Sequence, residues 1–190
     1  MEDLRLLNPL SKTNDIKQLP GYPKLKPAYI LKINIGNILT VGNIASGTKL
    51  LHVDTSTGTL TTAEGYEHKV TGEVIYGGDW MFNDPDQQHA RPNIKILIKT
   101  DDGLILSAEY TGVAVFSEPI KKMWAGDPSI TTFPFGISTT THTFSTGDPR
   151  YKFLETKTFV GNGRFVINEN PRSITVESRI SEVIASNDLE

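Results

Sequence analysis

Apolar and polar residues alternate along many short segments of this chain, and this pattern predicts β-strands. Between Tyr29 and Ile35 every second residue is apolar, while Lys32 and Asn34 lie on the opposite face. Similar segments follow at short intervals: Thr48–Thr55, Thr57–Thr62, His68–Tyr76, Asn93–Thr100, Leu104–Tyr110 with a continuation to Phe116, Ile137–Phe144, Lys152–Val160, Phe165–Ile167 and Ser173–Ala185. A sheet of this size within one domain must hide its edges. We therefore predict an all-β fold, a closed antiparallel β-barrel of roughly 8–10 strands.

The connections between these segments carry signals of their own. The sequence Asp101-Asp102-Gly103 suits a tight hairpin turn that needs a positive φ. Two loops are long, Met81–Pro92 and Ser117–Gly136, and long loops in a compact β domain are usually functional or disordered. Because the second contains Met123 and Trp124, we expect it to pack against the barrel. A lid over one barrel mouth is one interpretation of this loop.

The first 27 residues differ from the rest, because Pro9, Pro20, Pro23 and Pro27 interrupt regular structure. We predict an N-terminal extension over residues 1–27 that wraps the outside of the domain or closes one of its ends. One barrel domain follows over residues 28–190. A disordered tail is the alternative for the extension, since chain termini often fray.

Composition narrows the class of protein. No apolar run approaches the roughly 18 residues that a membrane-spanning helix needs. The formal net charge of −3 argues against a nucleic-acid binder that works by neutralising phosphates. The absence of Cys rules out disulfides, zinc–thiolate sites, iron–sulfur clusters and a cysteine nucleophile. Since the N-terminus also lacks the apolar stretch of a secretory signal, we expect a soluble cytoplasmic protein.

Common catalytic and cofactor-binding motifs are absent from the sequence. There is no Gly-x-Gly-x-x-Gly, P-loop, His-Glu-x-x-His or Gly-x-Ser-x-Gly motif. The four His residues, His52, His68, His89 and His142, are not spaced as zinc ligands usually are. We therefore predict neither a cofactor nor a metal, and any chemistry must come from Asp, His, Lys, Arg and Tyr side chains.

The first of three candidate clusters is Tyr76-Gly77-Gly78-Asp79-Trp80, at the end of a predicted strand. Paired glycines let the backbone bend or approach a ligand closely. At the rim of a barrel, Asp79 would act as a base or hydrogen-bond acceptor, and Trp80 as a wall against which a substrate stacks. The alternative is a turn in which Trp80 plugs the core.

The second cluster runs from Asn93 to Gly103. Alternation places Asn93 and Lys95 on one face of a strand and the Ile residues on the other. If the first face lines a polar lumen, Asn93 would contact the substrate. Burial would then lower the pKa of Lys95, which could act as a base, a Schiff-base amine or an anion clamp. The alternative is a solvated lysine at the edge.

The third cluster begins in the strand that ends at Phe144. Alternation puts Thr139 and Thr141 on one face, and His142 and Phe144 on the other. We expect His142 to move a proton, Phe144 to form an apolar wall, and Thr139 and Thr141 to contact the substrate.

Arg150 and Tyr151 complete the third cluster, immediately after the turn Gly147-Asp148-Pro149. The planar fork of Arg suits a carboxylate or an enolate, and Tyr can donate a hydrogen bond to a carbonyl oxygen. The alternative is a structural Arg150 that caps the turn and pairs with Asp148 or Asp79.

Four motifs in these regions occur in the same order in a known family. They are Gly77-Gly78-Asp79-Trp80, Thr100-Asp101-Asp102-Gly103, Phe144-Ser145-Thr146-Gly147-Asp148-Pro149-Arg150-Tyr151 and Phe159-Val160-Gly161-Asn162-Gly163. Through them the sequence from about Ala28 to Ile180 resembles the barrel proteins classed as domain of unknown function 3237, also called uncharacterised protein family 0311. The resemblance implies a closed antiparallel β-barrel and brings no established reaction.

The sequence departs from this family where a polar lumen would lie. Many members have Asp-Ala-Arg-Tyr where this chain has Asn93-Ile94-Lys95-Ile96, an Arg at the position of Thr139 and a Glu at that of Ser145. These differences imply a different ligand. Relatives of this type include fungal proteins near secondary-metabolite genes, which favours a polyketide-like or aromatic ligand.

Together these signals predict a small-molecule-binding barrel, and we expect a cofactor-independent enzyme of secondary or aromatic metabolism. Asp79 or His142 would move a proton, while Arg150, Lys95 and Tyr151 would stabilise an enolate. Isomerisation by proton transfer, cyclisation, dehydration and lactone hydrolysis fit these groups, so the class would be a cyclase-like lyase or isomerase. A non-catalytic carrier and a structural module with a filled barrel are the alternatives. We expect neither nucleic acid nor membrane as a partner, and a homo-oligomer stays open.

Overall fold

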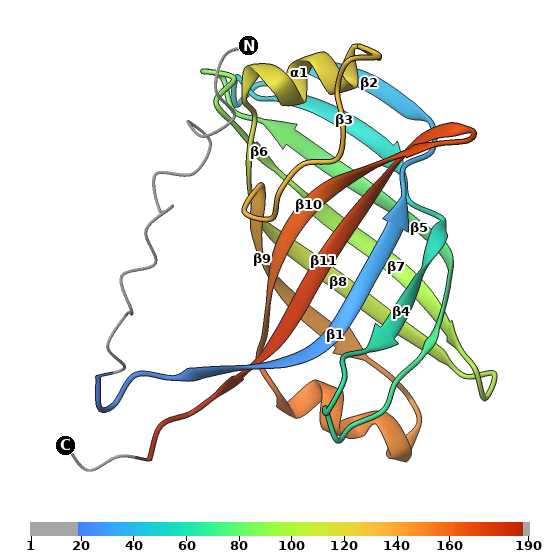
Figure 1. Cartoon of the computed structure of the whole chain (residues 1–190), viewed down its shortest axis with the longest axis vertical. Coiled ribbons are helices and arrows are strands. Elements are labelled where there is room, and N and C mark those ends of the chain that lie inside the picture. Colours follow the sequence, from blue (N-terminus) through green and yellow to red (C-terminus); the bar gives the residue numbers. More distant parts are fainter. Residues whose placement is uncertain (1–18, 188–190) are drawn as a thin grey trace.

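Antiparallel strands close into a ring in the computed structural model, which describes residues 19–187 (Figure 1). In hydrogen-bonded order the ring consists of β1 (Lys24–Asn34), β4 (Thr57–Thr62), β5 (Gly72–Asn83), β7 (Asn93–Thr100), β8 (Ile105–Val115), β9 (Ser138–Ser145), β10 (Phe159–Glu169) and β11 (Arg172–Ile184), which returns to β1. Closure is uneven, because β4 contacts β5 only through the stretch Gly58–Leu60. The predicted fold class, an all-β antiparallel barrel, is confirmed.

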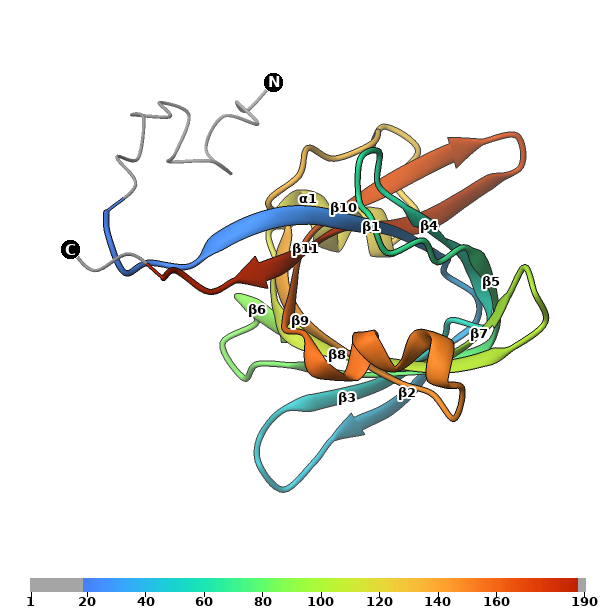
Figure 2. The same ribbon diagram turned by 90° about the horizontal axis from the view of Figure 1, so that it is seen from below.

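Three further strands extend the wall of the ring. The strands β2 (Ile38–Asn43) and β3 (Lys49–Asp54) form a hairpin, and β3 pairs with the second half of β5. Since β2 lies beyond β3, it is an edge of the sheet. Figure 2 shows this hairpin projecting from the barrel wall. The short strand β6 (His89–Arg91) pairs with the ends of β5 and β8.

Alternation of side chains determines which residues face the inside of the barrel. On β7, Ile94 and Ile98 are buried, whereas Lys95 and Lys99 are exposed. The turn that follows β7 is the predicted hairpin, in which Gly103 adopts a φ of +85°. Burying the isoleucines drives the strand against the core, while the lysines keep its outer face in water.

Apolar side chains fill one half of the barrel. Tyr29, Phe144 and Phe159 meet there with ring centroids 5.5–6.1 Å apart. The 3-10 helix η2 (Pro149–Thr156) closes this end and adds the buried Leu154 to the same core. Each large apolar side chain buried in this way contributes roughly 1.5–3 kcal/mol, so this half is a main source of stability.

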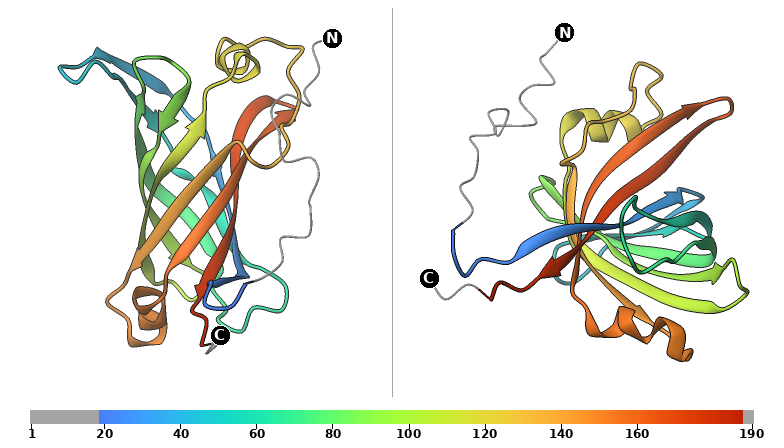
Figure 3. Two further views of the ribbon diagram at one scale, coloured as in Figure 1. Left: turned by 90° about the vertical axis from the view of Figure 1, so that its left-hand side faces the viewer. Right: turned by 60° about the horizontal axis from the view of Figure 1, so that its bottom comes forward.

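The helix α1 (Glu118–Trp124) covers the other end of the barrel (Figure 3). Its residues Ile120 and Met123 are buried in a second core with Phe133 and Ile137. The predicted packing of the loop Ser117–Gly136 is therefore confirmed. No helix within residues 19–187 has the length and apolar character to span a membrane.

The predicted strand Lys152–Val160 is wrong over its first half, because η2 continues as far as Thr156. Pro149 suits the first turn of a helix. The Asp148 carboxylate caps that turn by accepting the backbone N–H of Arg150 at 2.8 Å. The strand β10 begins only after this helix.

The segment Gly77-Gly78-Asp79-Trp80 lies inside β5 and does not end a strand, contrary to the prediction. A Cβ on the first of these glycines would lie 2.5 Å from the Ile96 side chain, and one on the second 2.6 Å from the His52 ring. The glycines therefore allow close packing on both faces of a continuous strand, and no turn is present here.

Two other predicted boundaries shift. Because β5 continues to Asn83 and β6 begins at His89, the predicted loop Met81–Pro92 shrinks to a short turn. The strand β2 went unpredicted because its exposed residues show no alternation of buried and polar positions.

The barrel also begins earlier than residue 28. The stretch Lys24–Pro27, assigned to the extension, pairs with Ser181–Ile184 of β11. Residues 1–18, the larger part of the predicted extension, lie outside the described residues. The prediction that it wraps the domain or closes one end stays a prediction.

Candidate functional site

The end of the barrel beneath α1 contains a cavity of about 60 Å³. Most of its walls are apolar side chains that point inward, such as Ile33, Ile94 and Phe165, and Trp124 at the end of α1 adds a further wall. A cavity of this size holds a few water molecules, whereas a cavity of about 150 Å³ is known to take up benzene. An aromatic ligand would therefore have to displace the α1 segment or extend through the mouth.

Asp79 is the carboxyl group in this cavity. It points inward from β5, is 6% exposed and accepts the backbone N–H of Asn93 at 2.9 Å. Burial disfavours the charged form and raises the pKa of Asp79 to about 6, an effect that the single hydrogen bond only partly offsets. Asp79 is thus a base with a pKa close to neutral pH, which is a property typical of catalytic carboxyls.

Two hydroxyl groups in the cavity lining have no hydrogen-bond partner. Tyr110 is 4% exposed and Thr55 fully buried, and neither hydroxyl oxygen has a partner among the described residues. Burial, reinforced by the charge of Asp79, raises the pKa of Tyr110, so its hydroxyl stays protonated. Leaving such groups unpaired costs roughly 1–3 kcal/mol each, which a bound ligand with oxygen atoms could recover.

Thr140 adds a third hydroxyl to the lining, and His142 lies directly below it. Thr140 Oγ1 is 2.8 Å from His142 Nε2, and the His142 ring lies tilted against Tyr110 at 4.7 Å. Burial lowers the pKa of His142 to about 3, so the imidazole is neutral at physiological pH. A Cβ at Gly161 would collide with both side chains, so only glycine leaves room for this pair. His142 does not line the cavity, but it orients a hydroxyl that does.

The cation in the lining, Arg164, is neutralised by a partner. Its Nε and Nη2 atoms donate to Glu177 Oε2 at 2.9 and 2.7 Å, and its guanidinium lies 4.4 Å from the centroid of the Phe135 ring. Glu177 is 2% exposed, so this ion pair is largely shielded from water. Among the described lining residues, the negative charge of Asp79 therefore has no free positive charge beside it.

Several predicted site residues lie on the outer face of the barrel. Lys95 is exposed and 3.5 Å from Glu109, and Trp80 is 42% exposed against His52. Lys95 was expected in a polar lumen and Trp80 as a stacking wall at the barrel mouth, and both expectations are wrong, because the inward positions of their strands belong to other residues. For Lys95 the alternative of a solvated lysine describes what is found.

The two threonines named as substrate contacts also point outward. Thr139 and Thr141 are exposed, and the inward positions of β9 are Thr140 and His142. The predicted alternation was right, but the wrong threonines were chosen. Asn93 reaches the site only through its backbone N–H, which binds Asp79.

Arg150 and Tyr151 lie at the end of the barrel that η2 closes, opposite the cavity (Figure 1). Arg150 pairs with Asp102 at 2.8 Å and Asp148 at 3.0 Å, and the Tyr151 hydroxyl donates to Asp102 at 3.3 Å. The alternative of a structural Arg that pairs with Asp148 describes this arrangement. Phe144 is buried in the filled half and does not reach the cavity.

The sequence contained a signal for the hydroxyls that were overlooked. Ile94 points inward, and the hairpin turn places Tyr110 directly opposite it. Thr140 shares its face with His142 by simple alternation. Thr55 follows the end of β3, and no pattern in the sequence indicated that it faces the cavity.

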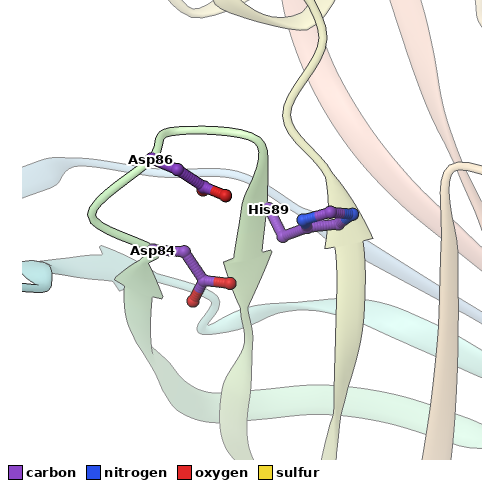
Figure 4. A group of neighbouring side chains, drawn as sticks. All are labelled: Asp84, Asp86 and His89. Carbon is purple, nitrogen blue, oxygen red and sulfur yellow. The ribbon is translucent and has the colours of Figure 1, made fainter.

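A separate group of side chains lies close enough to hold a cation (Figure 4). Asp84, Asp86 and His89 place one ligand atom each within 4.8 Å of one another. However, Arg91 binds Asp84 at 2.7 Å, and Asp86 accepts the backbone N–H of Gln88 at 2.9 Å. Both carboxylates therefore already have partners within the protein.

Solved structures share this fold. A protein of unknown function from Rhodopseudomonas palustris gives a TM-score of 0.68 at 21% identity, covering 85% of this chain and 98% of that one. A β-barrel-like protein from Acinetobacter baumannii AYE gives 0.63 at 21% identity, covering 88% and 99%. A structure described as an enzyme from Penicillium herquei gives 0.56 at 17% identity, again covering 88% and 99%. At these identities the likeness shows the fold alone.

A search of curated proteins gave no match. The family model described as protein of unknown function (DUF3237) matches residues 23–183, which include every strand of the closed ring except the last residue of β11. The match spans well over half of the sequence and ends where the barrel ends. The chain therefore belongs to the DUF3237 family.

Proposed function

We propose that this chain is a cofactor-independent enzyme that moves a proton within a small, largely apolar molecule bound beneath α1. The observation that carries the proposal is the buried Asp79 carboxyl, whose pKa burial raises to about 6, in a cavity shared with the unpartnered Tyr110 hydroxyl. At pH 7 such a carboxyl is mostly ionised, yet it is a stronger base than an exposed Asp.

The chemistry follows from these two groups. The Asp79 carboxylate takes a proton from the carbon next to a substrate carbonyl, and the electrons of the C–H bond form an enolate. The Tyr110 hydroxyl donates a hydrogen bond to the enolate oxygen, where the charge develops. Return of the proton to another carbon of the conjugated system completes an isomerisation and regenerates the carboxylate. The same enolate can serve in cyclisation or dehydration, and no oxidant or reductant is consumed.

The apolar walls of the cavity suit an aromatic or polyketide-like substrate of secondary metabolism, which would displace the α1 segment or extend through the mouth as it binds. Ile33, Ile94 and Phe165 provide apolar surface, and the hydroxyls of Tyr110 and Thr55 can pair with its oxygens. The enzyme from Penicillium herquei has the same fold, which supports catalysis as a use of such a barrel.

A neutral substrate is expected to bind better than a negatively charged one. Asp79 is ionised above pH 6, and Glu177 neutralises Arg164, so a second carboxylate in the cavity would face like charge in a poorly solvated space. At pH 8, 2-indanone should bind at least about tenfold more tightly than its ring-carboxylated analogue. Quenching of Trp fluorescence can measure both affinities. Equal affinity, or tighter binding of the carboxylate, would contradict the charge argument.

Tyr110→Phe tests the proposed function directly. Deuterium exchange at the enolisable positions of 2-indanone and related aromatic ketones in D₂O, followed by NMR, measures enolate formation. The substitution removes only the donor hydroxyl and should slow the exchange rate by about 10²-fold. Tyr151→Phe, at the opposite end of the barrel, is the matched control and should leave the rate within about twofold of the wild type.

A carrier without chemistry predicts a different result. The purified protein would then retain an unaltered neutral molecule in native mass spectrometry and accelerate exchange of none of the ketones. Equal loss of exchange in Tyr110→Phe and Tyr151→Phe would also contradict the site proposed beneath α1.

A further inference from the structure

Exposed apolar side chains gather on the outside of the barrel, away from the proposed site. On β5, Ile75, Tyr76 and Trp80 are 45%, 70% and 42% exposed, and on β2, Leu39 and Val41 are 63% and 64% exposed. We call these five residues the outer patch. Single exposed apolar residues are ordinary, but a group that includes Tyr and Trp is typical of an interface.

Strand register places three members of the outer patch, Leu39, Trp80 and Tyr76, on one face of the sheet. Leu39 lies opposite His52, and His52 lies opposite Trp80, so these three form one row across β2, β3 and β5. Tyr76 lies on the same face of β5 as Trp80, because the two are four positions apart and side chains alternate along a strand. The His52 ring packs edge-on against Trp80 with centroids 4.8 Å apart. The row is therefore a continuous surface.

We propose that the outer patch is the interface through which two copies of this chain form a dimer about a two-fold axis. The first argument is area. The five side chains offer on the order of 500 Å² of exposed apolar surface, which is near the upper limit for the patches of monomers. A stable interface buries about 800 Å² per partner, so the patch and its polar rim suffice.

The second argument concerns the edge of the sheet. Among residues 19–187 no strand pairs with the outer side of β2, and Ile38–Asn43 contains neither a charged residue nor Pro. Natural proteins usually protect edge strands with charges, Pro or a β-bulge, and of these β2 has only the irregularity between Thr40 and Gly42. Leu39 and Val41 of the outer patch belong to β2, which lies on the projecting hairpin (Figure 2). A second copy seated on the patch would therefore cover this edge as well.

The third argument is charge. A two-fold contact brings the same surface of both copies together, so a rim of one sign would repel itself. Next to the outer patch, Lys95 on β7 faces Glu109 on β8 at 3.5 Å, and both are half exposed. Since the rim contains both signs, it can meet its own copy without net repulsion.

Tyr76→Glu tests the dimer in the full-length protein. We expect light scattering coupled to size exclusion to give the mass of a dimer for the wild type at about 20 μM. A buried pair of unpartnered carboxylates should weaken association by at least about 100-fold, so that the variant elutes as a monomer. Tyr22→Glu is the matched control, because Tyr22 is 62% exposed and lies ahead of β1, outside the patch.

Circular dichroism establishes that each variant is folded, and Leu39→Lys on the edge strand provides a second disruption. Both patch variants should be monomeric, and Tyr22→Glu should remain dimeric. A wild-type protein that is monomeric at about 200 μM would overturn the proposal. So would a dimer that survives Tyr76→Glu and Leu39→Lys, or one that Tyr22→Glu dissociates equally.

Discussion

Asp79→Asn is expected to abolish proton transfer and to stabilise the folded protein at neutral pH. Burial raises the pKa of Asp79 from its ordinary value of 3.8 to about 6. The protonated side chain is therefore favoured in the folded state, and its contribution to stability, complete below pH 3.8, is lost as the pH rises through about 6. A shift of this size corresponds to roughly 3 kcal/mol. Asparagine carries no charge and avoids this loss.

Urea unfolding at two pH values measures the effect on stability. At pH 8 the variant should exceed the wild type by roughly 2–3 kcal/mol, and near pH 4 the difference should largely disappear. Glu73→Gln, at an exposed position on the same strand, is the control and should change the unfolding free energy little. A variant that is no more stable than the wild type at pH 8 would contradict the raised pKa.

The same variant tests the role of Asp79 as the base. The rate of ketone exchange by the wild type should rise with pH and reach half its maximum near pH 6, where the carboxyl ionises. In Asp79→Asn the rate should fall by at least about 10³-fold, because no other carboxyl or imidazole group lies among the described residues of the lining. Retained exchange in the variant would exclude Asp79 as the base.

Lys157→Met is expected to destabilise the fold strongly, although Lys157 lies far from the cavity. Glu182 is 5% exposed, and it binds Lys157 Nζ at 2.5 Å and the Tyr66 hydroxyl at 2.5 Å. Methionine preserves the aliphatic stem but removes the charge, which leaves the buried carboxylate with the Tyr66 hydroxyl as its only partner among residues 19–187. Such a loss costs about 3 kcal/mol at pH 7.

The deficit in Lys157→Met should depend on pH in a defined direction. Despite its burial, the Glu182 pKa in the wild type is lowered by Lys157 and Tyr66, so the contribution of the ion pair is complete above pH 4.5 and is lost as the pH falls. Urea unfolding should therefore show a smaller deficit at pH 4 than at pH 7, because the variant can protonate Glu182. Lys121→Met removes the exposed pair with Glu118 and should cost less than about 1 kcal/mol. If the two substitutions cost the same, Glu182 is not an effectively buried charge.

Alternation along the strands carried most of what the sequence could predict about the fold. It separates two faces of each strand, and closure of the sheet follows because so many strands cannot leave edges exposed. Alternation does not say which face is inside when both are partly polar. On β9, threonines occupy both faces, and the inward Thr140 was overlooked in favour of Thr139 and Thr141. On β7, the isoleucines occupy the inward face, so Lys95 points outward.

It was harder to predict from the sequence which end of the barrel each candidate residue occupies. Arg150 and Tyr151 follow β9 directly, but β9 runs from the cavity to the opposite end, so the turn after it lies far from Asp79. Residues that are close in the sequence can therefore lie at opposite ends of the barrel. The pairing of Ile94 with Tyr110 could have been predicted from the sequence, because the Asp-Asp-Gly turn sets the register of the two strands. The empty space beneath α1 depends on side-chain volumes summed over many strands, which no local pattern encodes.

The filled half of the barrel, packed around Tyr29, Phe144 and Phe159, affects which amino-acid substitutions the protein can tolerate. Its hydrogen-bonded ring and filled core can tolerate substitutions at the other end, where the side chains around Asp79 border an opening. Ile33 and Ile94 line the cavity but also belong to the same apolar core as Tyr29, so only apolar replacements of similar volume should keep the fold. A library limited to apolar residues at these two positions, and to small polar or apolar residues at Thr140, should yield mostly folded proteins with new ligand preferences, which makes this barrel a starting point for directed evolution.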